Sequence, residues 1–86
     1  FALDNAVSIE AANHKGIESQ VAGNADILVA PNLQVGNVLH KSIVYFAKKK
    51  VAAAVLGTTV PVVMTSRTDT IDNKLASIAL AVYISR

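Results

Sequence analysis

The sequence predicts an α/β fold in which helices flank a mostly parallel sheet. Two observations lead to this prediction. Short aliphatic runs at 27–30, 51–57 and 61–64 alternate with longer segments that have the apolar spacing of helices. In addition, 52% of the 86 residues are hydrophobic but only 5% are aromatic, so Ala, Val, Ile and Leu dominate. Such aliphatic runs are typical of strands buried on both faces of a parallel sheet.

The first helix is predicted over residues 6–15, after the end of a strand at residues 1–3. Asp4 or Asn5 is expected to cap this helix, because each side chain offers an oxygen to the free N–H groups of a first turn. Gly16 is expected to end it, because glycine readily adopts the left-handed conformation that follows many helices.

Two longer helices are predicted downstream. The segment 33–50 has one apolar stripe and ends in three lysines, which suit the negative end of the helix dipole. The last helix is expected to begin after a cap at Asp69 or Thr70. The link between 51–57 and 61–64 favours a tight turn to a neighbouring or antiparallel strand over a crossover. The two expected core stripes are Val35, Val38, Leu39, Ile43 and Phe46, and Ile71, Leu75, Ile78 and Val82.

Composition excludes several classes of protein. The net charge is only +2 and the single basic run is 48–50, which argues against a nucleic-acid surface. The absence of cysteine excludes disulfides and a cysteine nucleophile, disfavours zinc, and fits a cytoplasmic protein. No apolar run reaches the length of a membrane span, and no signal peptide is recognisable. Because the sequence opens at Phe1 rather than Met, we expect a piece of a longer chain.

Two predicted helix starts follow predicted strands. One carries Gly36, Asn37 and, a turn later, Lys41, and the other carries Ser66 and Arg67. In a parallel sheet both starts face one edge, where free backbone N–H groups and an arginine favour a phosphate or another anion. An ordinary surface arginine in a strand-to-helix turn is the alternative interpretation.

Three segments, 25–31, 36–41 and 61–67, stand in an order and spacing that resembles the C-terminal part of the phosphate acetyltransferase and phosphate butyryltransferase family. The segments 3–8 and 21–23 look more like the butyryltransferase branch. The resemblance implies a fragment of a two-domain acyltransferase fold of the isocitrate/isopropylmalate dehydrogenase type. It places residues 1–65 in one domain and assigns residues 66–86 a helix that returns to the other.

The resemblance also implies an activity and its residues. Acyl-CoA plus phosphate gives acyl phosphate plus CoA, so coenzyme A is a substrate, and no metal or bound cofactor takes part. Ser66 and Arg67 match the Ser-Arg pair of the cleft, and Gly36, Asn37 and Lys41 match a Gly-Asn-x-x-x-Lys segment. The missing N-terminal part is an expected partner, as is a second copy in a homodimer or higher oligomer, and the 86 residues alone are expected to be inactive.

Two positions depart from the family pattern. Asn73 stands where the acetyltransferase branch has an Asp thought to deprotonate the CoA thiol, and Asp72 or Asp69 is the candidate to replace it. His40 stands where the family often has Tyr. Two alternatives stay open at this point: a non-catalytic α/β ligand-binding or assembly module with an anion ledge, and a relative similar to decarboxylating dehydrogenases.

Overall fold

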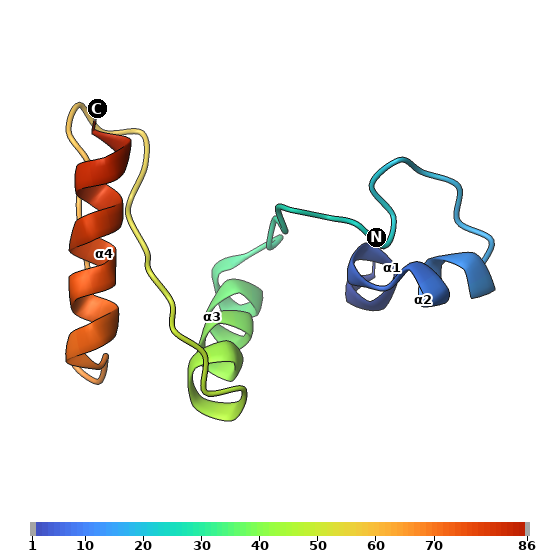
Figure 1. Cartoon of the computed structure of the whole chain (residues 1–86), viewed down its shortest axis with the longest axis horizontal. Coiled ribbons are helices and arrows are strands. Elements are labelled where there is room, and N and C mark those ends of the chain that lie inside the picture. Colours follow the sequence, from blue (N-terminus) through green and yellow to red (C-terminus); the bar gives the residue numbers. More distant parts are fainter. Residues whose placement is uncertain (1, 86) are drawn as a thin grey trace. The chain divides into compact units, whose positions relative to one another are not determined.

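A computed structural model describes residues 2–85 of the chain, which divides into two compact units, residues 1–31 and 32–86. The first unit contains helices α1 (Leu3–Val7) and α2 (Ile9–His14), followed by a long loop (Figure 1). The second unit contains the α-helices α3 (Leu33–Lys41) and α4 (Ile71–Ile84), and a π-helical segment η1 (Ser42–Phe46) that continues α3. None of the described helices combines the length and the hydrophobicity that a membrane span requires.

The first predicted helix is broken at Ser8. The Ser8 hydroxyl accepts a hydrogen bond from the backbone N–H of Ala11 at 3.2 Å, which makes it the cap of α2 and ends α1 at the preceding residue. The predicted caps Asp4 and Asn5 are wrong, because both lie inside α1. The strand end predicted for residues 1–3 is wrong at Leu3, which begins α1, while Phe1 lies outside the described residues.

The predicted stop at Gly16 is confirmed. Gly16 has a φ of +67°, its N–H donates to the carbonyl of Asn13 at 3.1 Å, and the next N–H, of Ile17, donates to the carbonyl of Ala12 at 3.0 Å. This pair of bonds satisfies two carbonyl groups that the end of α2 would otherwise leave without a donor.

The loop of the first unit folds back onto its helices through small residues. The N–H of Gly23 donates to the carbonyl of Asn5 at 2.8 Å, and the N–H of Ala25 donates to the carbonyl of Ala6 at 3.1 Å. A Cβ at Gly23 would lie 2.4 Å from the Cα of Ile9, so only glycine permits this approach. The buried apolar residues here are Ala6, Ala12 and Ala22.

The predicted helix 33–50 begins at the predicted residue but ends early. Asn32 caps α3 by accepting from the N–H of Val35 at 2.9 Å, and helical structure continues through η1 to Phe46. Lys48 has a φ of +55°, which a right-handed helix does not allow. The prediction that the lysine run 48–50 forms the last helical turn is therefore wrong.

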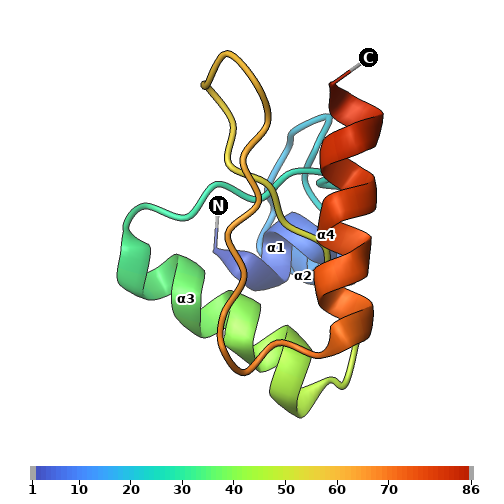
Figure 2. The same cartoon turned by 90° about the vertical axis from the view of Figure 1, so that its left-hand side faces the viewer.

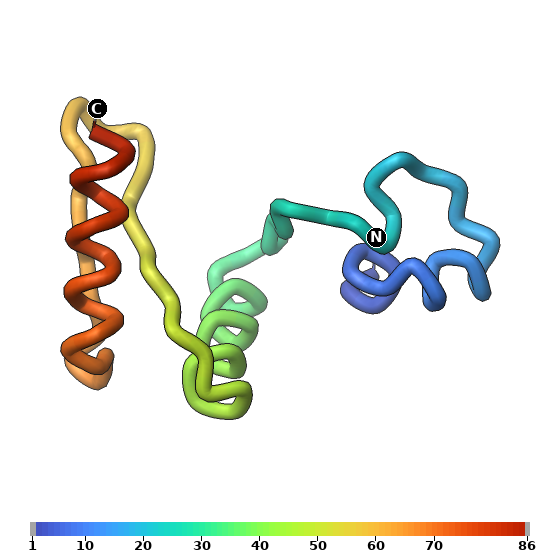
Figure 3. The backbone as a smooth tube through the Cα atoms, in the orientation of Figure 1, coloured from blue at the N-terminus to red at the C-terminus, as the bar shows by residue number. Residues whose placement is uncertain are grey.

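Beyond η1 the chain passes beside α4, bends over residues 57–60 and returns to the start of α4, as the tube in Figure 3 traces. A rotated view separates this returning loop from α4 (Figure 2). One antiparallel bridge joins Val55 and Val62, in which the N–H of Val55 donates to the carbonyl of Val62 at 2.8 Å. Of the two caps proposed for α4, Thr70 is confirmed, since its hydroxyl accepts from the N–H of Asn73 at 3.1 Å.

The predicted α/β fold with a mostly parallel sheet is wrong for this chain, because the described residues contain helices and one isolated bridge but no sheet. The runs 27–30, 51–57 and 61–64 are extended segments without a strand ladder. The reason is that aliphatic content favours a strand only where neighbouring strands pair with its backbone. The run 27–30 has no such neighbour among the described residues, and Val29 is 88% exposed.

The predicted core stripes are also wrong. On α4, Ile71 and Val82 are 75% and 64% exposed, whereas the buried residues of this helix are Asn73 and Ser77. The polar side chains of α4 therefore face the rest of the unit, for a reason that their hydrogen bonds explain below.

Candidate functional site

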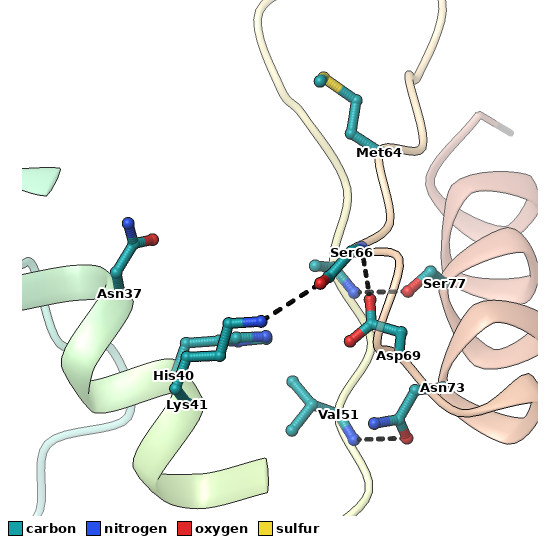
Figure 4. Close-up of a pocket in the computed structure, with 10 residues that line it drawn as sticks. Asn37, His40, Lys41, Val51, Met64, Ser66, Asp69, Asn73 and Ser77 are labelled. Carbon is teal, nitrogen blue, oxygen red and sulfur yellow. Dashed lines mark hydrogen bonds between the residues drawn. The ribbon is translucent and has the colours of Figure 1, made fainter. Parts of the chain in front are cut away.

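A cavity of about 200 Å³ lies within the second unit (Figure 4). One side is formed by α3, and the other sides come from the extended segment 51–53, the turn after Met64 and the first half of α4. The lining residues are Asn37, His40, Lys41, Val51, Ala53, Met64, Ser66, Asp69, Asn73 and Ser77. Most of these side chains are polar, so the cavity suits a polar or charged ligand.

The Lys41 ammonium group connects the two sides of the cavity. Its Nζ donates to the hydroxyl of Ser66 at 3.3 Å and lies 5.7 Å from the centre of the Tyr45 ring. The Tyr45 hydroxyl in turn donates to the carbonyl of Thr68 at 3.4 Å. These two contacts hold the turn 66–68 against α3 and η1. Figure 4 shows the Lys41 ammonium group directed at Ser66.

The Ser66 hydroxyl is saturated as an acceptor. It accepts from Lys41 and, at 3.3 Å, from the backbone N–H of Thr68, and a hydroxyl oxygen has two lone pairs. Its proton is therefore free to donate, and the Thr68 hydroxyl lies 3.0 Å away to receive it. A ligand oxygen that replaces the Thr68 hydroxyl would receive a donated hydrogen bond from Ser66.

The Asp69 carboxylate closes the same turn. Its Oδ2 accepts from the N–H of Ser66 at 2.8 Å, while the N–H of Asp69 donates to the carbonyl of Ser66 at 3.1 Å. The first bond holds the side chain of this half-buried residue at the cavity wall, and the second closes the backbone of the turn. The cavity therefore holds one carboxylate, Asp69, with Lys41 and His40 as its basic groups.

Two side chains of α4 hold the extended segment that forms another wall. The N–H of Val51 donates to Oδ1 of Asn73 at 3.2 Å, and the N–H of Ala53 donates to the hydroxyl of Ser77 at 3.0 Å. Four residues of helix rise about 6 Å and two residues of extended chain about 6.6 Å, so the two spacings match. This match explains why polar rather than apolar residues of α4 are buried.

The cavity brings together half of the predicted site residues. Asn37, Lys41 and Ser66 line it, whereas Gly36, Arg67 and Asp72 do not. Arg67 and Asp72 are exposed, and Gly36 is half-buried. Arg67 makes no hydrogen bond or ion pair with the part of the chain that the structure describes, so its guanidinium is available to a ligand next to Ser66.

Sequence reasoning missed Ser77 and assigned no role to the Asn73 amide beyond its failure as a base. Their spacing of four residues is the signal that was available, because polar residues at that spacing lie on one helical face. Among the described residues, no three His, Asp or Glu side chains gather where they would hold a metal ion.

Comparison with known proteins places these observations in a family. The family model described as "Phosphate acetyl/butaryl transferase" matches residues 1–82. A probable phosphate butyryltransferase of Bacillus subtilis is 56% identical over 85 residues, which cover 99% of this chain and 28% of the relative. A phosphate acetyltransferase of Thermotoga maritima is 56% identical over 81 residues, which cover 94% of this chain and 28% of the relative.

A solved structure agrees with these sequence matches. A branched-chain phosphotransacylase from Enterococcus faecalis superposes with a TM-score of 0.84 at 45% identity, over 95% of this chain and 31% of that protein. The chain therefore spans less than a third of the relatives it matches. The resemblance seen in segments 25–31, 36–41 and 61–67 is confirmed.

Proposed function

Since this chain belongs to the phosphate acetyl/butaryl transferase family, we propose that the protein containing it transfers an acyl group between phosphate and coenzyme A. The reaction is acyl-CoA plus phosphate giving acyl phosphate plus CoA, with a short acyl group and butyryl as the first candidate. Coenzyme A is a substrate in this proposal, and the reaction is placed in the cytoplasm. Relatives named for butyryl and for acetyl transfer match equally well, at 56% identity each, so the acyl group is chosen from the segments 3–8 and 21–23.

The observation that carries the proposal is the Lys41–Ser66 contact at the cavity, with Arg67 beside it. Acyl transfer to or from phosphate develops negative charge on phosphate and carbonyl oxygens, which cationic and hydroxyl donors stabilise. Lys41 supplies a positive charge, and Ser66 supplies a hydroxyl proton. Asn37 adds an exposed amide one helical turn before Lys41 on the same side of the cavity.

Arg67 is proposed to bind the phosphate group. A guanidinium offers two parallel N–H donors to a phosphate, and Arg67 has no partner among the described residues that would compete for them. Gly36 is proposed to support the close approach of the ligand to α3. Asp72, which is exposed and outside the cavity, is not retained as the base.

The remaining groups of the active site are proposed to come from the rest of the protein. Residues 1–65 are assigned to one domain and residues 66–86 to a segment that returns to the other. Packing against that missing part, or against a second copy in a homo-oligomer, would cover apolar residues such as Ile71 and Leu75, which are 75% and 59% exposed here. The 86 residues alone are therefore expected to be inactive.

The test is Arg67→Ala in the full-length protein, assayed with butyryl-CoA and phosphate. We expect kcat/KM to fall by about 100-fold or more, because one charge-stabilising donor is lost. Arg67→Lys should recover part of the loss, since the charge returns without the paired donors. Lys50→Ala removes an exposed cation outside the cavity and is the matched control. Full activity of Arg67→Ala would reject the role of Arg67, and a wild-type protein without acyl transfer would reject the function.

A further inference from the structure

We propose that Asp69 is the general base that takes the thiol proton of coenzyme A, an assignment that rests on the proposed function. The chemistry requires a proton acceptor, because the thiolate rather than the thiol is the strong nucleophile. Asp69 is the only carboxylate among the residues that line the cavity. The other candidate, Asp72, is exposed and lies outside it.

The position of Asp69 is fixed by the turn that also carries the proposed phosphate-binding residue. Its Oδ2 accepts from the N–H of Ser66 at 2.8 Å, and its own N–H donates to the carbonyl of Ser66 at 3.1 Å. Its second oxygen, Oδ1, accepts no hydrogen bond from the described residues, so it retains free lone pairs. The turn thereby holds the Asp69 carboxylate at the cavity wall, next to Ser66, with one oxygen available.

Asn73 has a structural role instead, because its side chain holds the segment that begins at Val51. An amide has no basic site, and the Asn73 oxygen already accepts from the N–H of Val51 at 3.2 Å. This hydrogen bond fixes the amide orientation, since a backbone N–H bonds only to the oxygen. Figure 4 shows Asn73 on the Val51 nitrogen and Asp69 above it, next to Ser66. The side chain that replaces a carboxylate at position 73 thus holds a wall of the cavity, and Asp69 provides the carboxylate.

The proposed step conserves atoms and electrons. The thiol S–H proton moves to the Asp69 carboxylate while sulfur forms its bond to the acyl carbon of the acyl phosphate. The bond between that carbon and the bridging oxygen then breaks, and phosphate leaves with the electron pair. Asp69 returns the proton to a phosphate oxygen, so hydrogen phosphate departs and the carboxylate is restored. In the reverse direction the same carboxylate takes the proton of the attacking phosphate.

Two basic groups face the cavity from α3. The Lys41 ammonium group donates to the Ser66 hydroxyl at 3.3 Å. His40 is half-buried on the α3 side, across the cavity from the turn that carries Arg67. Because His40 also lines the cavity, the experiment includes a His40 variant beside the Asp69 variants.

The main experiment measures the pH dependence of kcat with butyryl phosphate and CoA in the full-length enzyme. Asp69→Asn keeps an oxygen for the N–H of Ser66 but removes the base. We expect kcat to fall by about 100-fold and the acid limb of the profile to disappear, with the KM for butyryl phosphate nearly unchanged. Asp72→Asn is the matched exchange, and its effect should stay within about threefold, since surface substitutions usually have small effects.

Three further variants make the outcome decisive. Asp69→Asn combined with Asn73→Asp should recover part of the lost kcat, because a carboxylate returns to the cavity. His40→Gln should keep the acid limb. If Asp69→Asn retains wild-type kcat while Asp69→Ala does not, Asp69 only positions Ser66 and the assignment fails. It also fails if His40→Gln removes the acid limb and Asp69→Asn does not. In both cases the proposed function is still supported if the wild-type enzyme is active and the Arg67→Ala variant is impaired.

Discussion

Each of the two units is stabilised internally by a different kind of hydrogen bond. In residues 1–31, the loop is tied to α1 by bonds between backbone groups, such as the 2.8 Å bond from Gly23 to Asn5, and small residues allow the close approach. In residues 32–86, side chains bond to the backbone of distant segments, as Asn73 does to Val51 and Ser77 to Ala53.

The two units also differ in what their buried side chains do. In the first unit the hydrogen bonds to the loop come from backbone groups, and the described buried residues are Ala6, Ala12, Ala22 and the polar Asn5, whose side-chain oxygen accepts no hydrogen bond. The second unit places polar side chains inside, and the same residues that hold its segments, Asn73 and Ser77, also line the cavity. Buried polar groups are costly unless they are paired, so these pairs are both structural supports and cavity walls.

The largest expected effect on stability tests the close approach in the first unit. Gly23→Ala should destabilise the protein by about 3 kcal/mol, because the new Cβ overlaps Ile9 and the left-handed conformation is strained. The added Cβ would lie 2.4 Å from the Cα of Ile9, and Gly23 has a φ of +79°. Gly16→Ala is the matched control, since its φ is +67° but no atom lies within 4 Å, and it should cost about 1 kcal/mol. Urea unfolding of the full-length protein measures both, and equal losses would contradict the role of the Ile9 contact.

A smaller effect is expected from the side-chain support in the second unit. Asn73→Ala should cost about 2 kcal/mol, because the N–H of Val51 loses its acceptor in a partly buried place. The next residue on the same helix provides a control, as Lys74→Ala should stay within about 0.5 kcal/mol. Thermal unfolding of the two variants gives the comparison. A protein that tolerates both exchanges equally would show that water satisfies Val51 as well as Asn73 does.

The smallest effect belongs to the ion pair of the first unit. Lys15 donates to Asp4 at 2.7 Å, and this hydrogen bond lowers the pKa of Asp4 from its ordinary 3.8, with help from the N–H of Asn5. Because the pKa is lower in the folded state, the pair stabilises the fold above pH 3.8 and loses this effect as the pH falls through the lowered value.

The measurement is an NMR titration of the Asp4 carboxyl carbon in wild type and Lys15→Met. The pKa should rise toward 3.8 in the variant. Both groups are about half exposed, so solvent screening keeps the effect on stability small. An unchanged titration in Lys15→Met would assign the shift to the backbone N–H of Asn5 alone.

Local chemistry was predictable at several positions. The stop of α2 at Gly16, the start of α3 after Asn32 and the cap at Thr70 follow from the residues within a few positions of each one. The break at Ser8 was missed because a hydroxyl within a helical pattern is also tolerated without capping. The family was recognisable because three segments kept their order and spacing.

By itself, the sequence determined the local caps and stops, the family, and the presence of Ser66, Lys41 and Asp69 as candidate polar groups. Only the tertiary structure decided which of them share a cavity: it brings Lys41 to Ser66 and leaves Asp72 outside. It also decided that the aliphatic runs are extended segments rather than a sheet. The physical reason is that caps depend on neighbours in sequence, whereas strands and cavities depend on partners that are distant along the chain.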